Sequence, residues 1–542
     1  MGLPADMLIP YGYHKAKINI QEFDEKKIAA SKLILVTAIT PTKAGIGKTT
    51  TSVGLADGLK KLKKNVVLAL REPSLGPCFG MKGGAAGGGY SQVIPMEEIN
   101  LHFNGDFHAI TAANNTLAAL LDNYRFYNRG KPEGIKTVLF KRCLDVNDRV
   151  LRKIVTALDT PNNGIPSETG FVITPASEIM AVLCLSEGLT ELRQKIDNML
   201  LGFTFAGNGF TTKDLGVTGA ITALLKDAIQ PNLVQTLEGT PAMIHGGPFA
   251  NIAHGCNSLM ATKTALQFGD YVVTEAGFAT DLGAEKFFNI KCRTSGLRPD
   301  AGVVVATLRA LKLHGGGGTV KSGSPLPPGL TEPNQEALER GFANLEQHIA
   351  NVRAHGVPVV VAVNAFKDDS PQELDWVCER ALAVGASAAA VSTHWADGGK
   401  GAEELARAVV KVAAQGSQFK HLYDATSPIK KKIETIATTI YGAAGVSYSA
   451  QAEKDIESAV RLGFEQLPIC MAKTPLSLSH DPALKGRPSG FTLPIQELRI
   501  LSGAGFLTAV CSGIQLMPGL PKKPAGERID IDPRSGEIVG LA

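Results

Sequence analysis

The stretch LILVTAITPTKAGIGKTT (residues 33–50) joins an apolar run to a glycine-containing loop, and it decides the fold class. Its first part, 33–39, is a nearly continuous run of Val, Ile and Leu, which is typical of a strand covered on both faces. A helical stretch follows the loop, and a second apolar run, NVVLAL, occupies 65–70. The order strand, loop, helix and strand is the setting that a phosphate-binding loop requires.

The loop matches the second half of the phosphate-loop pattern G-x-x-x-x-G-K-[ST]. Thr42 stands where the first glycine is usual. Backbone N–H groups and the helix N-terminus would face the phosphates, Lys48 would reach the β- and γ-phosphates, and Thr49 would offer its hydroxyl to Mg²⁺. A glycine turn without a ligand is the alternative. The predicted ATP-binding residues are Thr42, Lys43, Ala44, Gly45, Ile46, Gly47, Lys48, Thr49 and Thr50.

An early lysine in the loop allows a second interpretation. Because of Lys43, the loop also resembles the deviant phosphate loop of dimeric, MinD-like ATPases, which are regulatory proteins. Glu275, at the end of another apolar run, resembles the acidic strand end that faces Mg²⁺ in such folds. It does not separate the two interpretations.

Further apolar runs alternate with helical stretches, at 270–276, 302–308 and 358–366. Such alternation predicts an α/β fold with a mostly parallel sheet. The expected division is a P-loop-type nucleotide domain at 1–110 plus about 230–365, an inserted α/β domain at about 111–229, and a C-terminal domain at about 366–542 that contributes to a substrate site.

Arg71 and Glu72 follow the second predicted strand. Ligands of open α/β sheets bind at the carboxyl ends of strands, and an arginine there can clamp a carboxylate or an acyl phosphate. MinD-like proteins usually place an aspartate at this strand end. Glu72 would orient Arg71 or a metal; packing or a surface ion pair is the alternative.

Composition excludes several classes of protein. The 542 residues carry a net charge of +4, which is too small to predict nucleic-acid binding. No apolar run approaches the ~20 residues that a membrane span needs, and the N-terminus lacks the order of a signal peptide. The eight cysteines form no C-x-x-C pair, so we expect a reduced, cytoplasmic protein whose partners are small molecules.

Two segments carry a family resemblance. GMKGGAAGGGY (80–90) and VATLRALKLHGG (305–316) resemble the signature segments of the formate–tetrahydrofolate ligase (10-formyltetrahydrofolate synthetase) family. Several segments look closest to the synthetase portion of eukaryotic C1-tetrahydrofolate synthases. Similar stretches extend over nearly the whole chain, at 11–18, 92–115, 175–185, 226–258, 272–293, 359–366, 393–402 and 467–474.

The resemblance implies a reaction. Formate, MgATP and tetrahydrofolate would give 10-formyltetrahydrofolate, ADP and phosphate through formyl phosphate. Lys48 and Arg71 would then hold the transferring phosphoryl group and the formyl phosphate, with Glu72 beside them. The resemblance also implies activation by a monovalent cation, K⁺ or NH₄⁺, and a homo-oligomer, either a dimer or a tetramer.

Four further residues are assigned roles by the same resemblance. His102 and His245 lie in segments similar to active-site stretches of the family, which suggests substrate contact or proton transfer; a structural histidine is the alternative. Phe366 and Trp395 occupy the places where the family has the aromatic residues that sandwich the pterin of the folate. Packing is the alternative for this pair.

Three positions depart from the family pattern. Ile46 stands where an acidic residue is usual, Lys43 where a proline or small residue is usual, and Tyr124 where bacterial members often have histidine. The segment 126–137 is also shorter than the family pattern. The loop is therefore more positive than the family pattern, and a catalytically silent paralogue that binds folate or nucleotide stays open beside the MinD-like ATPase.

Overall fold

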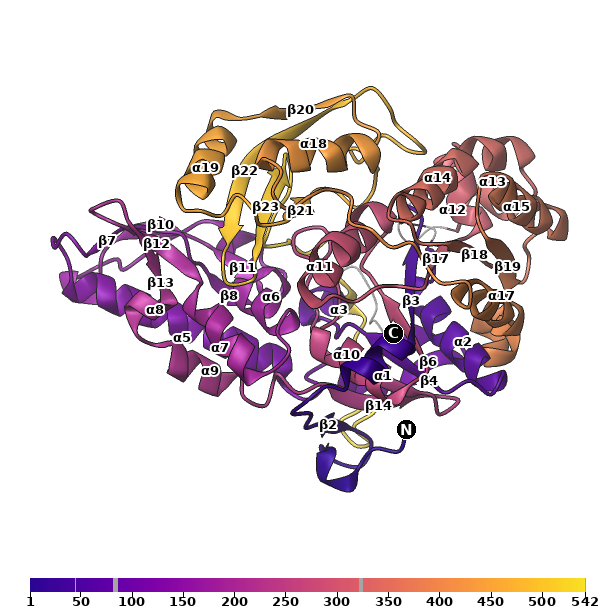
Figure 1. Ribbon diagram of the computed structural model, residues 1–542, viewed down its shortest axis with the longest axis horizontal. Coiled ribbons are helices and arrows are strands. Elements are labelled where there is room, and N and C mark those ends of the chain that lie inside the picture. Colours follow the sequence, from indigo (N-terminus) through magenta and orange to yellow (C-terminus); the bar gives the residue numbers. More distant parts are fainter. Residues whose placement is uncertain (44, 81–85, 321–324, 542) are drawn as a thin grey trace.

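A computed structural model describes residues 1–43, 45–80, 86–320 and 325–541 of the protein. Three bodies make up the molecule: a large sheet with its helices, a middle body at its side, and a C-terminal body above both (Figure 1). Among the described residues, no helix combines the length and the apolarity needed to cross a membrane.

The large sheet has twelve strands, and its central part is parallel, as predicted. Antiparallel strands near the N-terminus form one edge of this sheet. The order along the main path is β1 (Leu8–Pro10), β2 (Ala16–Ile18), β14 (Asn232–Thr236), β15 (Pro241–Ile244), β4 (Val66–Leu70), β16 (Tyr271–Glu275), β3 (Lys32–Ala38), β17 (Ala301–Ala306), β18 (Val359–Asn364) and β19 (Ala388–Ser392), with β5 (Gly87–Gly88) and β6 (Ser91–Ile94) attached beside it.

Helices cover the sheet, and this explains the continuous apolar runs. Every residue of β4, β17 and β18 is buried, because side chains on both strand faces meet helices. The helices that pack on its strands are α2 (Lys48–Lys61), α10 (Leu259–Phe268), α14 (Gln335–Ala354), α15 (Pro371–Ala383) and α17 (Glu403–Ala413). Shorter helices nearby are α1 (Glu25–Ala30), α3 (Leu75–Phe79), α4 (Met96–Asn100), α12 (Leu308–His314), α13 (Pro328–Thr331) and α16 (His394–Asp397).

Strand β19 and helix α17 follow the boundary expected at about 365, yet they belong to the large sheet. β19 pairs in parallel with β18, and α17 packs on β19. The short apolar run in β19 consists mostly of alanine, so its place in the sheet comes from this pairing.

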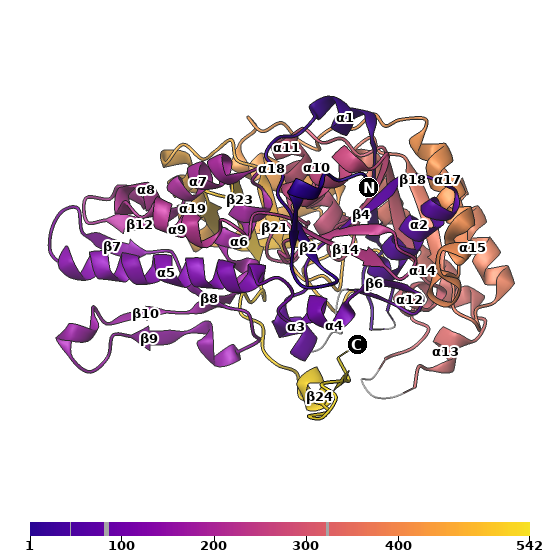
Figure 2. The same ribbon diagram turned by 90° about the horizontal axis from the view of Figure 1, so that it is seen from below.

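The middle body begins with α5 at Asp106, a few residues before the insertion predicted at about 111–229. Helix α5 (Asp106–Tyr127) runs along it, and the hairpin of β9 (Ile154–Thr156) and β10 (Ser167–Thr169) lies beside that helix (Figure 2). Its other elements are β7 (Ile135–Val138), β8 (Arg142–Leu144), β11 (Phe171–Ile173), α6 (Glu178–Cys184), α7 (Leu189–Asp197), β12 (Leu200–Thr204), β13 (Gly209–Thr211), α8 (Thr212–Leu215) and α9 (Thr218–Leu224).

The C-terminal body has a sheet of order β20-β22-β23-β21 and a hydrophobic core of its own. Two amphipathic helices supply the other side of that core. The elements are α18 (Ile429–Thr439), β20 (Gly445–Tyr448), α19 (Ala450–Arg461), β21 (Ile469–Ala472), β22 (Thr492–Leu501) and β23 (Phe506–Cys511), and a tail follows with β24 (Asp530–Ile531) and β25 (Ile538–Val539).

A π-helical segment links the sheet to the loop at 250–258. It comprises Thr280–Ala284 and Phe287–Lys291 and continues into α11 (Cys292–Ser295). The fully buried Lys291 donates to the Asn257 carbonyl oxygen at 2.8 Å and to Thr262 Oγ1 at 2.7 Å. Because its acceptors are structural groups, this lysine fastens the loop in place.

Candidate active site

The predicted phosphate loop lies between β3 and α2. Gly47 caps α2 with a left-handed φ of 73°, and a Cβ at this position would lie 2.5 Å from Asn364 Nδ2. The same amide donates to the Ile46 carbonyl oxygen at 2.9 Å. Only glycine fits here. The first backbone N–H groups of the 14-residue helix α2 therefore lie beside the loop. The predicted Ala44 lies outside the described residues.

Lys48 and Thr49 converge on a buried carboxylate. Lys48 Nζ lies 2.7 Å from Glu275 Oε2, and Thr49 Oγ1 donates to the same oxygen at 2.9 Å. Glu275 is the last residue of β16, the strand between β3 and β4. Burial alone would raise the pKa of Glu275, but the charges of Lys48 and Arg71 lower it overall. The carboxylate therefore stays ionised between two cations.

Arg71 completes this cluster at the end of the adjacent strand β4. Its Nε lies 3.9 Å from Glu275 Oε1, and its Nη1 donates to the Pro248 carbonyl oxygen at 3.1 Å. Because parallel strands end at one edge of the sheet, residues far apart in the sequence meet here. Two cations share one carboxylate, so the cluster keeps one net positive charge and attracts anions.

The predicted aromatic pair lies at the carboxyl edge of the same sheet. Phe366 and Trp395 follow the neighbouring strands β18 and β19, and the Ala365 amide donates to the Ser392 carbonyl oxygen at 3.0 Å. The Arg309 guanidinium stacks 3.9 Å from the centroid of the Phe366 ring. The Trp395 side chain is 59% exposed.

A glycine turn joins the aromatic side to the phosphate loop. A Cβ on Gly88 would lie 3.6 Å from Trp395 Nε1 and 4.0 Å from Thr50 Oγ1. A Cβ on Gly89 would stand 2.9 Å from the Trp395 ring carbons Cδ2 and Cε2. Glycine at 88–89 thus allows the indole to lie close to the start of α2.

Comparison with known proteins agrees with this arrangement. The family model described as formate–tetrahydrofolate ligase matches residues 1–542. The chain belongs to the formate–tetrahydrofolate ligase family. It is 54% identical over 542 residues to the formate–tetrahydrofolate ligase of Porphyromonas gingivalis, and the match covers 100% of this chain and 96% of that relative. Corresponding ligases of Bacteroides thetaiotaomicron and Phocaeicola vulgatus are 53% and 54% identical, again over 100% of this chain and 96% of each relative.

In this ligase-family chain, His245 is a structural histidine by its contacts. The side chain is fully buried, with Nε2 2.6 Å from the Ala228 carbonyl oxygen and Nδ1 2.6 Å from Ser258 Oγ. Since a carbonyl only accepts, Nε2 carries the proton and donates it. Burial, as the main cause, lowers the pKa of His245 to about 4. Both nitrogens are occupied, which favours the structural alternative over the predicted catalytic role.

The other histidines of these segments differ from His245. His102 is exposed just before α5, and no hydrogen bond or ion pair joins it to Lys48, Arg71 or Glu275 within the described part of the chain. His254 is buried, and neither of its ring nitrogens has a hydrogen-bond partner among the described residues. Burial, followed by the charges of Lys291, Lys286 and Arg71, keeps the pKa of His254 well below its usual value.

Glu72 is buried rather than part of a surface ion pair. Its backbone amide donates to the Gly246 carbonyl oxygen at 2.9 Å, and its Oε2 has no hydrogen-bond partner within the described ranges. Burial first, and then the charge of Asp106, raises the pKa of Glu72 well above its usual range. Among the described residues Glu72 forms no ion pair with Arg71, so it lies beside the cluster without joining it.

The departures from the family pattern have structural counterparts. The Ile46 side chain is 8% exposed and belongs to the main hydrophobic core, whereas Lys43 is exposed. Tyr124 packs in the middle body, with its ring 4.9 Å from that of Phe210. Ile46 therefore fills the core beneath the loop, and only Lys43 adds charge at its surface.

Glu275 is the centre of the cluster, and its sequence pattern alone does not predict this position. Its position at the end of an apolar run was the available signal, but its contact with Lys48, Thr49 and Arg71 depends on strand order. Across the described residues, no group of three or more His, Cys, Asp or Glu side chains is arranged to hold a metal ion. The Mg²⁺ position predicted at Thr49 stays a prediction.

Proposed function

We propose that this chain catalyses the ATP-dependent ligation of formate to tetrahydrofolate, giving 10-formyltetrahydrofolate, ADP and phosphate through formyl phosphate. The observation that carries the proposal is the convergence of Lys48, Thr49 and Arg71 on Glu275, in a chain matched over its full length by the ligase family. The full-length match removes the MinD-like regulatory ATPase from consideration.

The first step activates formate. A formate oxygen attacks the γ-phosphorus of ATP, the new C–O–P bond forms, and the bond from the γ-phosphorus to the bridging oxygen breaks as ADP leaves. Lys48 neutralises charge on the γ-phosphoryl group, and Arg71 holds the formate and then the formyl phosphate. The Thr49 hydroxyl would serve as a protein ligand for the Mg²⁺ that accompanies ATP, and that ion would add to the neutralisation of phosphate charge.

The second step transfers the formyl group. The N10 amine of tetrahydrofolate attacks the formyl carbon, phosphate leaves with the C–O bond electrons, and N10 loses a proton. Phe366 and Trp395 hold the pterin at the same sheet edge, so N10 reaches the formyl carbon without leaving the site. Their place after adjacent parallel strands supports this assignment.

Glu275 keeps the two cations in position before substrates bind. The negative charge of Glu275 offsets the repulsion between Lys48 and Arg71, so the two cations can lie close together. A preorganised site of this kind avoids the cost of reorienting charges during the reaction. We assign Glu275 as a positioning residue for both cations.

The family resemblance supports three broader inferences. We infer activation by K⁺ or NH₄⁺, a homo-oligomer that is a dimer or a tetramer, and a cytoplasmic protein. The cysteines form no disulfide among the described residues, which suits a reducing compartment.

The direct test is ADP formation from MgATP with K⁺ present, omitting formate and tetrahydrofolate one at a time. We expect rapid ADP release only when both are supplied. ATP binding without this dependence would contradict the proposal and would favour the catalytically silent paralogue.

A further inference from the structure

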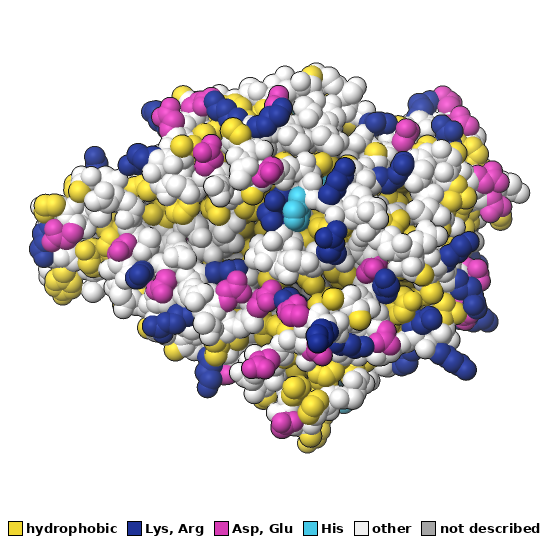
Figure 3. Space-filling view, viewed as in Figure 1, with side chains coloured by type: hydrophobic (Ala, Val, Ile, Leu, Met, Phe, Trp, Pro, Cys, Tyr) yellow, Lys and Arg dark blue, Asp and Glu magenta, His cyan; other side chains and the backbone are white. Residues whose placement is uncertain are grey.

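A cleft separates the middle body from the C-terminal body. Its volume is about 360 Å³, which lies within the usual range of roughly 300–1,000 Å³ for small-molecule sites. Figure 3 shows hydrophobic side chains along the boundary between these two bodies. The apolar part of the lining comprises Val138, Phe140, Leu200, Phe203, Leu498 and Leu501.

Two cations line this cleft, one from each body. Lys141 lies between β7 and β8, and Arg499 lies on β22. Within the described residues, Lys141 Nζ makes no hydrogen bond or ion pair. The carboxylate nearest to Arg499 is Glu497, with 3.8 Å between Arg499 Nε and Glu497 Oε1. Burial, followed by the charge of Arg499, lowers the pKa of Lys141. Lys141 therefore faces the cavity without an ion-pair partner among the described residues, and Arg499 has only the long ion pair with Glu497, which also lines the cleft.

Of the three carboxylates in the lining, Glu497 pairs with Arg499, and the other two accept hydrogen bonds from neighbouring groups. Glu178 Oε1 accepts from the Gly503 amide at 2.8 Å and from the Ala504 amide at 3.3 Å. Asp455 accepts from the Leu498 amide at 3.0 Å and from Gln451 Nε2 at 2.8 Å. These contacts hold β22 and its turn in place, and among the described residues neither Glu178 nor Asp455 forms an ion pair with Lys141 or Arg499.

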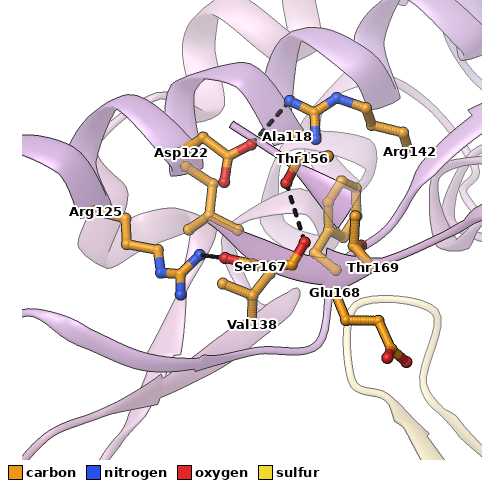
Figure 4. Close-up of a pocket in the computed structure, with 11 residues that line it drawn as sticks. Ala118, Asp122, Arg125, Val138, Arg142, Thr156, Ser167, Glu168 and Thr169 are labelled. Atoms are coloured by element: carbon orange, nitrogen blue, oxygen red, sulfur yellow. Dashed lines mark hydrogen bonds and ion pairs between the residues drawn. The ribbon is translucent and has the colours of Figure 1, made fainter. Parts of the chain in front are cut away.

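A smaller pocket in the middle body provides the contrast (Figure 4). Its volume is about 40 Å³, enough for only a few waters. There Arg142 Nη2 lies 2.8 Å from Asp122 Oδ2, and Arg125 Nη1 donates to Ser167 Oγ at 2.7 Å. Both arginines have protein partners, so this pocket is explained by the fold alone.

We propose that the cleft binds a small organic anion whose apolar body packs on the aliphatic and aromatic lining and whose carboxylate or phosphate lies between Lys141 and Arg499. An occupant would bridge the two bodies, since each supplies one cation. The lining shares no residue with the candidate active site. Binding here is therefore separable from ligase turnover.

The test uses three matched probes on the full-length protein: naphthalene-2-carboxylate, 2-naphthyl phosphate and the neutral naphthalene-2-carboxamide. Calorimetry gives each dissociation constant. We expect at least one of the two anions to bind about tenfold or more tightly than the amide, and the better anion identifies the preferred head group. Equal affinity for all three probes would overturn the proposal.

Variants locate the binding. Lys141→Met keeps the length of the side chain and removes no protein contact, so it should bring anion affinity down to that of the amide; Arg499→Met should do the same. Lys213→Met, at an exposed lysine in α8, is the matched control and should bind like the wild type.

A competing location at the aromatic half of the active site is tested with Trp395→Ala. Loss of anion binding in Trp395→Ala, with retention in Lys141→Met, would overturn the cleft assignment. ADP formation should be unchanged in Lys141→Met, which keeps failure of this proposal distinct from failure of the ligase assignment.

Discussion

The two halves of the candidate active site are built in opposite ways. In the phosphate half, Glu275 is 1% exposed and Lys48 and Arg71 are held against it. In the aromatic half, Trp395 is 59% exposed and rests on a glycine turn. One half is held together by ion pairs within the protein, whereas the other is open to solvent.

The difference follows from the forces involved. Charges act strongly only when they are fixed and shielded from water, so the phosphate half requires a rigid frame of strand ends and a helix N-terminus. Stacking on an aromatic ring needs an open face and draws its free energy from area that the ligand removes from water. We therefore expect substitutions in the first half to affect catalysis and those in the second half to affect folate affinity.

The largest effect is expected for Lys48→Met. Loss of the cation that we assign to the phosphoryl group should lower kcat by about 10³-fold, in line with the roughly 10²–10³-fold cost of removing one oxyanion donor. It also deprives the buried Glu275 of its closest partner, so the melting temperature should fall as well. Turnover and thermal denaturation measure the two effects.

Lys43→Met is the matched control, because this exposed lysine lies in the same loop. A change of less than about threefold in kcat, roughly 0.7 kcal/mol, is expected. If Lys43→Met is as damaging as Lys48→Met, the loop works in the manner of MinD-like ATPases, and the comparison of the two halves loses its basis.

Arg71→Ala should lower formate-dependent turnover by about 10²-fold or more, while the affinity for ATP stays within about threefold of the wild type. The reason is that we assign Arg71 to the acyl phosphate and not to the nucleotide. Arg71→Lys retains the charge but loses the bidentate geometry, so it should recover only part of the activity. Nearly normal turnover in Arg71→Ala would remove this residue from the mechanism.

Trp395→Ala should raise KM for tetrahydrofolate about tenfold, equivalent to roughly 1.4 kcal/mol, and leave KM for ATP unchanged. Because the indole is largely exposed, stability should change little. Trp376→Phe, at the only other tryptophan, is the control: that ring packs edge-on against Phe342 and should not affect folate kinetics. Unchanged folate kinetics in Trp395→Ala would contradict the stacking role.

The smallest effect on catalysis is expected for His245→Gln, whose consequence should be on stability. Burial lowers the pKa of His245 from 6.5 to about 4, so the folded protein does not bind the proton that the unfolded chain binds below pH 6.5. Wild-type stability from this residue therefore falls as the pH falls, by up to about 1.4 kcal/mol per pH unit. Glutamine does not titrate.

The destabilisation caused by His245→Gln should thus be larger at pH 7 than at pH 5, as measured by urea denaturation. His102→Gln is the control and should leave stability unchanged at both pH values. A stability difference between His245→Gln and the wild type that does not depend on pH, or a hundredfold loss of kcat with unchanged stability, would support a catalytic role for His245.

The amino-acid sequence by itself determined the central sheet, the phosphate loop and the placement of Phe366 and Trp395 at one edge. Apolar runs of strand length and the GKTT loop are local signals, and parallel strands bring their carboxyl ends together whatever their order. The family resemblance needed only linear motifs, and the full-length match confirmed it.

Tertiary structure alone decided which side chains meet. Glu275 contacts Lys48 and Arg71 because β16 lies between β3 and β4. Both ring nitrogens of His245 are hydrogen-bonded, one to Ala228 and the other to Ser258. Lys141 and Arg499 line the same cleft only because two separate bodies pack side by side. Such contacts depend on strand order and on the packing of distant segments, and no local pattern of residues encodes either of them.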